Sequence, residues 1–330
     1  MAKKNVLDDF SLLSGNEIMA ETAIRAGCRY YFGYPITPQN EISAYMSKKM
    51  PQINGVFIQA ESELAAINMV LGASAAGKRV LTSSSSPGIS LKQEGISYLA
   101  GCELPALIFN IMRGGPGLGS IGPSQSDYFQ ATRGGGHGDY RLIVYGPTYL
   151  EEAVKTIYHS YDKAERYRIP VMIICDGIMG QMMENVNLPK MKKYREKKFN
   201  WNIDGCRNRE PRKIRSLFLN LNELYRHNKK LQKKYEQIKR REVRWKEWGA
   251  EDANLVIIAY GSPGRIIEKI VLEMRQKGRK VGYLRPITLW PFPAERIREL
   301  SIKGKSFLVV EMNEGQMVED VLLYSRSRTK

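Results

Sequence analysis

The sequence predicts an α/β protein, with a doubly wound, mainly parallel sheet in residues 10–190 and a second, smaller α/β domain in residues 251–330. Over residues 10–190, short apolar runs typical of buried strands alternate with segments of helical periodicity. The same alternation returns after residue 250, and the basic stretch 191–250 between the two regions lacks it. Ligands of such sheets bind at the carboxyl ends of the strands, so we expect function to reside in the loops that follow them.

The first domain begins with a helix that its start signal predicts. Ser14 and Glu17 form a capping box, and Gly27 is placed to end the helix. The elements that follow alternate, with strands expected at 28–34, 55–58, 79–85, 106–112 and 171–176 and helices at 42–49, 61–77, 91–100 and 150–166.

The rest of the chain is predicted to hold a connector and the second domain. The connector carries one expected helix, residues 219–245. The second domain is expected to have strands at 255–261, 280–286 and 306–312 and helices at 265–277 and 293–300.

The composition indicates an ordinary globular protein. Of the 330 residues, 43% are hydrophobic and 26% charged. No run of about 18 apolar residues is present, and the N-terminal MAKKNVLDDFS has no apolar signal core. We therefore expect a cytoplasmic protein without a membrane span. Because the cysteines are isolated from one another, we expect no zinc or iron–sulfur cluster on this chain. The four cysteines are Cys28, Cys102, Cys175 and Cys206.

The net charge of +17 is concentrated in one segment. Between Lys190 and Lys246 there are about 21 Lys and Arg against about 6 Asp and Glu, a net charge of about +15. A surface of this kind binds nucleic acid, binds an acidic protein or is simply solvated. The stretch lacks the glycine-flanked aromatics of an RNA-binding sheet, so we expect no nucleic-acid function. Docking of an acidic partner is the hypothesis that the charge supports.

One carboxylate, Glu63, is predicted to lie on the buried side of its helix. The positions three, four and seven residues later are Ala66, Ile67 and Val70, whereas Glu61 lies about 200° around the helix. A buried carboxylate is usually protonated or bonded to a specific partner, because burial of an unpaired charge is costly. The alternative is a carboxylate that only favours the positive end of the helix dipole.

Two of the loops that follow strands are rich in prolines and hydroxyls. In GYPITPQ (33–39), two prolines fix the backbone and present the Thr37 hydroxyl. The loop SSSSPGIS (83–90) leads into a helix and suits a polar ligand. The alternative for both is an ordinary turn.

Two further loops are rich in glycine. In MRGGPGLGSIGPSQSDY (112–128), Arg113 leaves a strand into a loop that permits close backbone approach. In TRGGGHGDY (132–140), His137 lies in a glycine run. The alternatives are an ion pair between Arg113 and a neighbouring carboxylate, and a histidine that touches no ligand.

One glycine pattern is misleading. Gly117, Gly119 and Gly122 match G-x-G-x-x-G, but Pro123 follows where a dinucleotide-binding site opens a helix. We therefore expect no nicotinamide site. The sequence also contains no Walker A lysine and no G-x-S-x-G nucleophile elbow.

Taken together, these motifs resemble the alpha subunit of the 2-oxoacid:ferredoxin oxidoreductases. The shared stretches are GYPITP, ESELAAINM, SSSSPGISL, MRGGPGLG and GGGHGDYR, with LRPITLWPFP and VVEMNEGQMVED later in the chain. The resemblance spans roughly residues 10–324 and is strongest to the branch that acts on 3-methyl-2-oxobutanoate (2-ketoisovalerate). It implies a pyrimidine-type thiamine diphosphate-binding domain followed by a smaller domain like the C-terminal domain of transketolase.

The resemblance also implies roles for particular residues. Glu63 falls on the family glutamate that hydrogen-bonds the pyrimidine ring nitrogen, favouring the imino tautomer that removes the proton from the thiazolium carbon. Thr37 and Arg113 would face the 2-oxoacid, whose carboxylate suits an arginine fork. The other residues implied at the cofactor are Pro35, Ser85, Ser86 and His137.

The chain lacks half of such a cofactor site. A G-D-G segment with a later asparagine, which binds the diphosphate and its Mg²⁺, is absent, and Asp176-Gly177 is not preceded by glycine. The resemblance implies a beta subunit that binds the diphosphate, a gamma subunit, and a ferredoxin-like delta subunit carrying iron–sulfur clusters. A 2-oxoacid, coenzyme A and oxidised ferredoxin would then give acyl-CoA, carbon dioxide and reduced ferredoxin in an obligate hetero-oligomer.

Two alternatives to this function remain open from the sequence. One is the 2-oxoglutarate branch of the same family, and the other is a non-catalytic scaffold subunit. Family members continue for about two to three dozen residues beyond VVEMNEGQMVEDV, whereas this chain ends SRSRTK. We therefore expect a frayed end and a second domain that lacks an edge strand.

Overall fold

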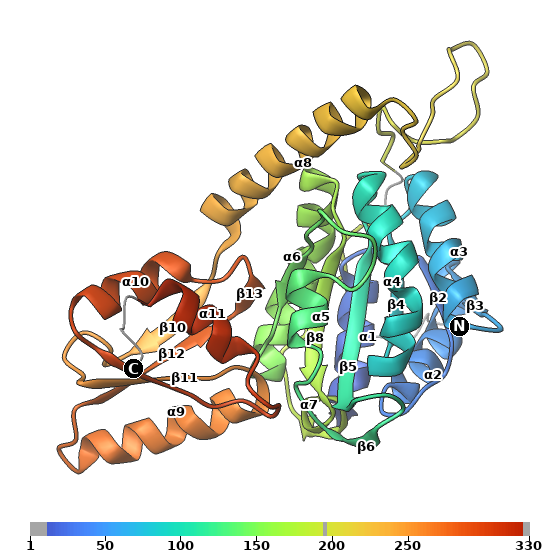
Figure 1. Cartoon of the computed structure of the whole chain (residues 1–330). Helices are drawn as coiled ribbons and strands as arrows, with labels where there is room; N and C mark the ends of the chain where they lie inside the picture. The colour runs from blue at the N-terminus through green and yellow to red at the C-terminus, as the bar shows by residue number, and fades with distance from the viewer. Residues whose placement is uncertain (1–11, 194–196, 326–330) are drawn as a thin grey trace.

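A computed structural model describes residues 12–193 and 197–325 and shows two α/β units bridged by one long helix (Figure 1). The larger unit has a sheet of strand order β13-β7-β8-β5-β4-β2-β3, with β6 paired to β5. Six of these strands run parallel to one another, namely β2, β3, β4, β5, β7 and β8. The predicted mainly parallel sheet is therefore confirmed. The strands of this sheet are β2 (Tyr30–Gly33), β3 (Val56–Gln59), β4 (Val80–Ser84), β5 (Leu107–Gly114), β6 (Ser120–Pro123), β7 (Ile143–Tyr145), β8 (Val171–Asp176) and β13 (Thr288–Trp290).

Helices cover both faces of this sheet. One layer contains α3 and α4, which pack on each other, and the other contains α1, which packs on α2 and α6 (Figure 1). The capping box predicted for α1 is present, since the Glu17 carboxylate accepts a hydrogen bond of 2.9 Å from the Ser14 backbone N–H. The helices of this unit are α1 (Gly15–Arg25), α2 (Asn40–Lys49), the 3₁₀ turn η1 (Pro51–Ile53), α3 (Glu63–Ala75), α4 (Ser86–Gly101), α5 (Tyr128–Arg133), α6 (Leu150–Tyr167) and α7 (Gly177–Gln181).

The smaller unit is a four-stranded sheet with its own helices. Its strand order is β10-β12-β11-β14, in which β10 is antiparallel to β12 and the other neighbours are parallel. The elements are β10 (Trp245–Trp248), β11 (Leu255–Ile258), β12 (Val281–Pro286), β14 (Ser306–Val309), α9 (Gly261–Gln276), α10 (Ala294–Ile302) and α11 (Met317–Tyr324). The strand β10 lies before residue 250, while the division of the chain at residues 190 and 250 stays a prediction.

The two units share strands and hydrogen bonds. The strand β13 comes from the smaller unit but pairs antiparallel with β7 of the larger sheet. The Asp176 carboxylate, at the end of β8, accepts hydrogen bonds of 2.9 Å from the Ser262 backbone N–H and 2.6 Å from its hydroxyl. The units are therefore packed against each other at the carboxyl end of β8.

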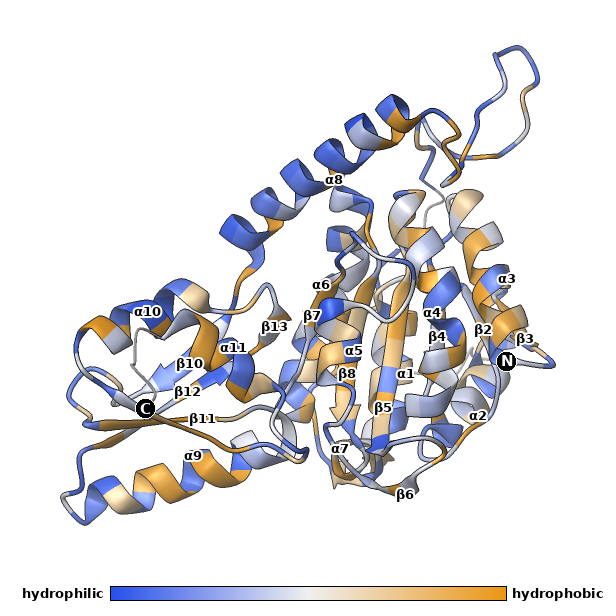
Figure 2. Ribbon diagram, viewed as in Figure 1, coloured by the Kyte–Doolittle hydropathy of each residue, from blue (hydrophilic) through white to orange (hydrophobic). Residues whose placement is uncertain are grey.

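The connector helix α8 (Leu221–Glu242) runs from the far end of the larger unit toward the smaller one (Figure 1). Its surface is largely hydrophilic, in contrast to the apolar strands of the central sheet (Figure 2). A two-stranded ladder of β1 (Leu13–Ser14) and β9 (Met183–Glu184) completes the described fold. Of the expected frayed end SRSRTK, residues 326–330 lie outside the described residues.

Candidate active site

Four neighbouring parallel strands bring four of the predicted site residues to one edge of the sheet. Arg113 is the next-to-last residue of β5, and the segments that follow β4, β2 and β3 contain Ser85, Thr37 and Glu63 respectively. This is the edge at which doubly wound sheets bind their ligands. The adjacency of these strands could not be known from sequence spacing alone.

Glu63 is the first residue of α3 and is buried, with 5% of its surface exposed. The Ser62 hydroxyl caps the helix by accepting a hydrogen bond of 3.2 Å from the Ala65 backbone N–H. Ala66, Ile67 and Val70 are fully buried, while Glu61 is exposed. The predicted orientation of the helix is therefore confirmed. Within the described residues, no protein group donates a hydrogen bond to the Glu63 carboxylate, so a ligand nitrogen can do so.

Gly88, in the first turn of α4, lies directly against this carboxylate. A Cβ atom built on Gly88 would lie 2.5 Å from Glu63 Oε1 and 2.1 Å from Ser84 Oγ. Only a residue without a side chain fits here, because atoms do not approach this closely. Gly88 thus allows the N-terminal end of α4 to close over Glu63.

Two hydroxyls beside this contact have no partner. Ser84 ends β4, Ser85 precedes α4, and both are fully buried. Neither side-chain oxygen makes a hydrogen bond in the part of the chain that the structure describes. Buried polar groups of native proteins are almost always hydrogen-bonded, so two orphan hydroxyls beside a buried carboxylate indicate a place for a polar ligand. Of the two, the sequence predicted Ser85 as a site residue but not Ser84.

Ser86 has a different environment from its neighbours. Its hydroxyl donates to Asp127 Oδ2 at 2.6 Å and accepts from the Arg113 backbone N–H at 3.0 Å. Asn110 Nδ2 also donates to Asp127 Oδ2, at 2.8 Å. Burial raises the pKa of Asp127, and these two hydrogen bonds oppose the rise. The contacts of Ser86 connect α4 to β5 and to the start of α5, and its expected place at the cofactor stays a prediction.

Arg113 and Thr37 lie together as expected, although the Arg113 side chain contacts the backbone of Thr37 and not its hydroxyl. Arg113 Nη1 donates to the Thr37 carbonyl oxygen at 3.1 Å, and Nη2 donates to the Leu118 carbonyl oxygen at 2.9 Å. The Nε–H of Arg113 is buried and has no partner among the described residues. The alternative considered from the sequence, an ion pair with a neighbouring carboxylate, is not formed by Arg113 in this part of the chain.

A buried hydrogen-bond chain holds the loop of Thr37 in place. The Ser83 hydroxyl donates to Gln39 Oε1 at 2.6 Å and is 2.7 Å from the Tyr31 hydroxyl. Gln39 Nε2 in turn donates to the Tyr34 carbonyl oxygen at 3.1 Å. The loop is therefore fixed to the end of β4, while the Pro35 and Thr37 side chains stay exposed.

His137 is not part of this cluster. It is exposed in the loop after α5. Two residues earlier, Gly135 donates its backbone N–H to Gln93 Oε1 at 3.2 Å, and a Cβ on Gly136 would meet the Gln93 carbonyl oxygen. Gln93 is more than one helical turn beyond Gly88, so this loop follows α4 away from Glu63.

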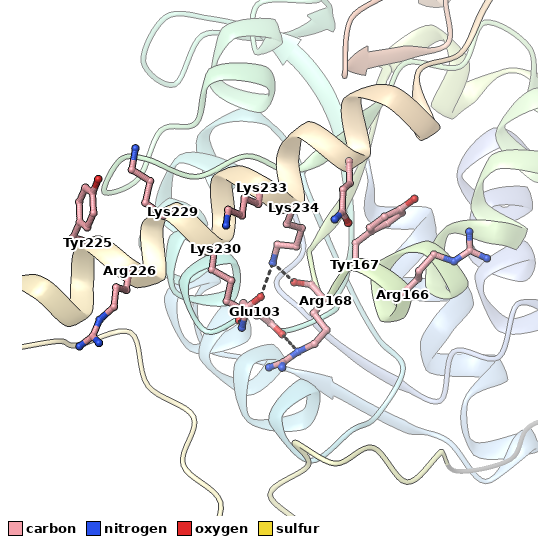
Figure 3. A pocket seen from close by; sticks show the side chains of 11 residues that line it. Glu103, Arg166, Tyr167, Arg168, Tyr225, Arg226, Lys229, Lys230, Lys233 and Lys234 are labelled. Atoms are coloured by element: carbon pink, nitrogen blue, oxygen red, sulfur yellow. Dashed lines mark hydrogen bonds and ion pairs between the residues drawn. The ribbon is translucent and has the colours of Figure 1, made fainter.

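A basic hollow lies at the opposite end of α4. It has a volume of about 760 Å³ and is formed between α8 and the segments around Glu103 and Arg168 (Figure 3). Glu103 receives a hydrogen bond of 3.1 Å from Lys234 and a contact from Lys230, so this carboxylate fastens α8 to the larger unit. The 16 residues of α4 span about 24 Å, which separates the hollow from Glu63.

The described residues contain neither a cluster of metal-binding side chains nor a helix that could cross a bilayer. No cluster of three or more His, Cys, Asp or Glu side chains is arranged to hold a metal ion in residues 12–193 and 197–325. No helix within these same ranges is both long and apolar enough to cross a bilayer. The Asp176 carboxylate is engaged by Ser262 and by the first backbone N–H groups of α7, at 3.1 and 3.2 Å.

The doubly wound unit with a buried glutamate at its ligand-binding edge is of the thiamine diphosphate-binding class. The family model described as pyruvate flavodoxin/ferredoxin oxidoreductase, thiamine diphosphate-binding, matches residues 21–246, and that for pyruvate:ferredoxin oxidoreductase core domain II matches residues 253–329. The chain belongs to the 2-oxoacid:ferredoxin oxidoreductase family, as the sequence motifs predicted.

Relatives with curated names support this membership. The chain is 48% identical to the ketoisovalerate oxidoreductase subunit VorB of Methanothermobacter marburgensis, over 96% of this chain and 90% of that protein. It is 35% identical to the 2-oxoglutarate synthase subunit KorA of Methanocaldococcus jannaschii, over 94% and 90% of the two chains.

Solved structures agree on the fold. The 2-oxoglutarate:ferredoxin oxidoreductase of Magnetococcus marinus, solved with 2-oxoglutarate, coenzyme A and succinyl-CoA bound, superposes with a TM-score of 0.87 at 25% identity. The match covers 96% of this chain, which spans 60% of that longer chain. A split-gene transketolase, at 11% identity and a TM-score of 0.53, shares the fold over 95% of this chain and 85% of its own.

Proposed function

We propose that this chain is a subunit of a thiamine diphosphate-dependent oxidoreductase that decarboxylates 2-ketoisovalerate and passes the electrons to ferredoxin, with coenzyme A accepting the acyl group. The observation that supports it most is the buried Glu63 carboxylate, free of protein hydrogen bonds in the described residues and flanked by the orphan hydroxyls of Ser84 and Ser85. These groups fit a polar heterocycle that presents both a ring nitrogen and an amino group.

In this proposal, Glu63 shares a proton with the pyrimidine ring nitrogen and thereby acts as a proton relay. Ser84 and Ser85 offer the remaining hydrogen-bonding groups of the pocket, and Gly88 leaves room for the ligand to lie against Glu63. Bound thiamine diphosphate supplies the carbon nucleophile and the electron sink that decarboxylation of a 2-oxoacid requires. The chain itself contributes positioning and proton transfer.

Arg113 is proposed to orient the carboxylate of the 2-oxoacid. Its guanidinium is held by two backbone carbonyls, which fix its plane, and its buried Nε–H retains hydrogen-bonding capacity for a substrate. Thr37 and Pro35, in the loop that Arg113 contacts, would line the same side. An arginine fixed in this way distinguishes a carboxylate by geometry as well as by charge.

Replacing Arg113 with lysine is expected to lower kcat/KM for the 2-oxoacid about 10- to 100-fold. The variant keeps the charge but loses the fork, and hydrogen bonds to charged groups contribute about 1.5–3 kcal/mol each. Steady-state kinetics of the assembled enzyme measure this effect. Arg133→Lys is the matched control, because Arg133 forms surface ion pairs with Glu319 and Asp320. Equal kcat/KM values for the two variants would remove Arg113 from substrate binding.

The diphosphate and its Mg²⁺ are proposed to bind a beta subunit, so that the site forms between chains. Asp176 belongs to the Asp-Gly pair that comes nearest in sequence to the G-D-G motif. Its carboxylate already accepts hydrogen bonds from Ser262 and from the first turn of α7. Apolar side chains are exposed near Glu63 and Arg113, namely Tyr34 at 37%, Leu64 at 46% and Leu118 at 77%. Such a rim suits burial against a partner subunit. The gamma subunit and the iron–sulfur delta subunit complete the proposed assembly.

The surface of α8 is proposed to dock an acidic partner such as the ferredoxin-like delta subunit. Lys229 and Lys233 project from α8 (Figure 3) and are exposed. Apolar side chains are exposed beside them at the start of the helix, with Leu221 at 80% and Tyr225 at 62%. A basic surface with apolar anchors fits an acidic protein better than a nucleic acid.

Reversing the charge of Lys229 and Lys233 together is expected to weaken delta-subunit binding about tenfold or more at low salt, and hardly at all near 0.5 M salt. These two lysines are chosen because Lys230 and Lys234 contact Glu103 and hold α8 in place. The control is the double variant Lys269→Glu, in α9, and Lys277→Glu, at the C-cap of that helix, which makes the same change in net charge. Sedimentation of the mixed subunits measures binding, and an equal effect of both pairs would contradict a specific docking surface.

The proposed function is tested by purifying this chain with its partners and assaying ferredoxin reduction. Reduction that depends on 2-ketoisovalerate, coenzyme A and thiamine diphosphate supports it. A strong preference for 2-oxoglutarate would favour the other branch, to which the chain is also similar. A stable complex that binds no thiamine diphosphate would favour a scaffold subunit.

A further inference from the structure

Asp127 is a buried acidic residue to which the proposed mechanism gives no role. It is the N-cap residue of α5, but its side chain does not cap that helix. Its Oδ2 accepts hydrogen bonds from the Ser86 hydroxyl at 2.6 Å and from Asn110 Nδ2 at 2.8 Å. Asn110 Oδ1 accepts a hydrogen bond from the Ser86 backbone N–H at 3.2 Å. The three buried residues therefore form a closed ring of hydrogen bonds.

This ring holds the main chain of Arg113. The Arg113 backbone N–H donates to the Ser86 hydroxyl at 3.0 Å, and its carbonyl oxygen accepts from the Ser126 hydroxyl at 3.3 Å. These bonds matter because, at Arg113, β5 has passed the end of its pairing with β4 and with β8. Its neighbour across the antiparallel strand β6 is Pro123, which has no N–H to donate. Side-chain hydroxyls thus hold Arg113 where the parallel sheet no longer does.

The segment that carries Asp127 is anchored from its other side by the smaller unit. Gln125 is fully buried; its backbone N–H donates to the Met312 carbonyl oxygen at 2.9 Å, and its Oε1 accepts from the Met312 N–H at 3.0 Å. Gln316 Nε2 donates to the Ser126 carbonyl oxygen at 2.7 Å. Asp127 therefore belongs to a segment that is fixed on both sides, and its side chain can set the position of the groups that bond to it.

Ser86, which Asp127 holds, lies where the two halves of the proposed site meet. It is the first residue of α4 and follows Ser85, whose buried hydroxyl has no partner in the described residues. Two residues later, Gly88 lies against the Glu63 carboxylate. On its other side, Ser86 bonds the backbone of Arg113. One hydroxyl thus connects the cofactor half of the site to the substrate half.

We propose that Asp127 is a positioning residue that acts through Ser86 to fix Arg113 relative to the start of α4. The inference rests on the proposed function, in which Arg113 orients the carboxylate of the 2-oxoacid and the start of α4 borders the cofactor. The distance between these two groups determines whether the substrate carbonyl meets the reactive carbon of the cofactor. A misplacement of about 1 Å between reacting groups can lower a rate about 100-fold.

The test is a double-mutant cycle on the assembled complex, with kcat/KM for 2-ketoisovalerate as the measured quantity. Asp127→Leu has a similar volume but accepts no hydrogen bond, and it is expected to lower kcat/KM about tenfold or more. Asp127→Asn should recover most of this loss, because one amide oxygen can accept both hydrogen bonds. When the arginine fork is already removed by Arg113→Lys, Asp127→Leu should lower kcat/KM by a further factor of about two at most, because its effect passes through that fork.

Glu165→Leu is the matched control for a purely structural effect. The Glu165 side chain, in α6, is 8% exposed and bonds Arg79 at 2.6 Å. Arg79 precedes β4, at the opposite end of that strand from Ser85. Any loss in kcat/KM that Glu165→Leu causes should therefore multiply with the loss caused by Arg113→Lys. If Asp127→Leu does not assemble, Ser86→Ala, which removes the connecting hydroxyl itself, takes its place in the cycle.

The outcomes separate the inference from the function on which it rests. Losses in Asp127→Leu and Arg113→Lys that multiply, as in the control, would overturn the inference. An Asp127→Leu enzyme with the wild-type kcat/KM, or an Asp127→Asn enzyme as impaired as Asp127→Leu, would do the same. A wild-type kcat/KM for Arg113→Lys alone would instead overturn the proposed role of Arg113 in substrate binding.

Discussion

Replacing Glu63 with glutamine is expected to lower the turnover of the assembled enzyme by about 10²- to 10⁴-fold, the usual contribution of a general acid–base group. Glutamine has nearly the same shape and can still hydrogen-bond the ring nitrogen, but it cannot relay a proton. The affinity for thiamine diphosphate should therefore change much less than the rate. Steady-state turnover and cofactor titration of the same preparation measure the two effects.

The control for this variant is Glu61→Gln. Glu61 precedes Glu63 by two residues and is exposed, so the same chemical change there should leave the rate within about twofold, as at most surface positions. A near-wild-type rate for Glu63→Gln would show that the buried carboxylate has no part in the chemistry. It would also leave its burial beside two orphan hydroxyls without a functional reason.

Replacing Gly88 with alanine is expected to weaken thiamine diphosphate binding by 100-fold or more. The new methyl group would lie 2.5 Å from Glu63 Oε1 and 2.1 Å from Ser84 Oγ, so the carboxylate and the hydroxyl must both move. Overpacking of this kind costs about 1–3 kcal/mol, and displacement of Glu63 adds the loss of its charged hydrogen bond to the cofactor. Equilibrium binding of the cofactor to the complex measures the change.

The chain offers a matched Gly→Ala control in the neighbouring helix. Gly72 lies within α3, and a Cβ there would meet nothing within 4 Å. Gly72→Ala should bind the cofactor normally and raise helix stability by roughly 0.5–1 kcal/mol. Similar cofactor affinities for the two alanine variants would contradict the placement of Gly88 against the ligand.

The sequence predicted the alternation of strands and helices and the orientation of α3, because burial patterns and capping signals are local. It placed the start of α4 at residue 91, five residues late, although Pro87 in the first turn is typical of a helix start. It missed β13, which joins the larger sheet from the smaller unit. That pairing is set by the packing of the two units, and no periodicity in three residues reveals it.

Within the site, residue type was predictable but hydrogen bonding was not. Ser84, Ser85 and Ser86 look alike in the sequence, yet only the structure distinguishes the two orphan hydroxyls from the one bonded to Asp127. The burial of Lys92 was missed, because a lysine within a helix is ordinarily solvated. The spacing of Gly88 and Gly95 on either side of it was the one signal of this burial. Two glycines on one helix face indicate that a neighbouring element packs closely there.

In the proposed mechanism, Glu63 of this chain controls proton removal from the thiazolium carbon of the cofactor. The most direct measurement is the rate at which that carbon exchanges its proton for deuterium in the assembled complex, followed by quenched-flow NMR. We expect fast exchange in the wild type and in Glu61→Gln, and exchange slower by about 10²-fold or more in Glu63→Gln. Equal exchange rates in wild type and Glu63→Gln would contradict the account.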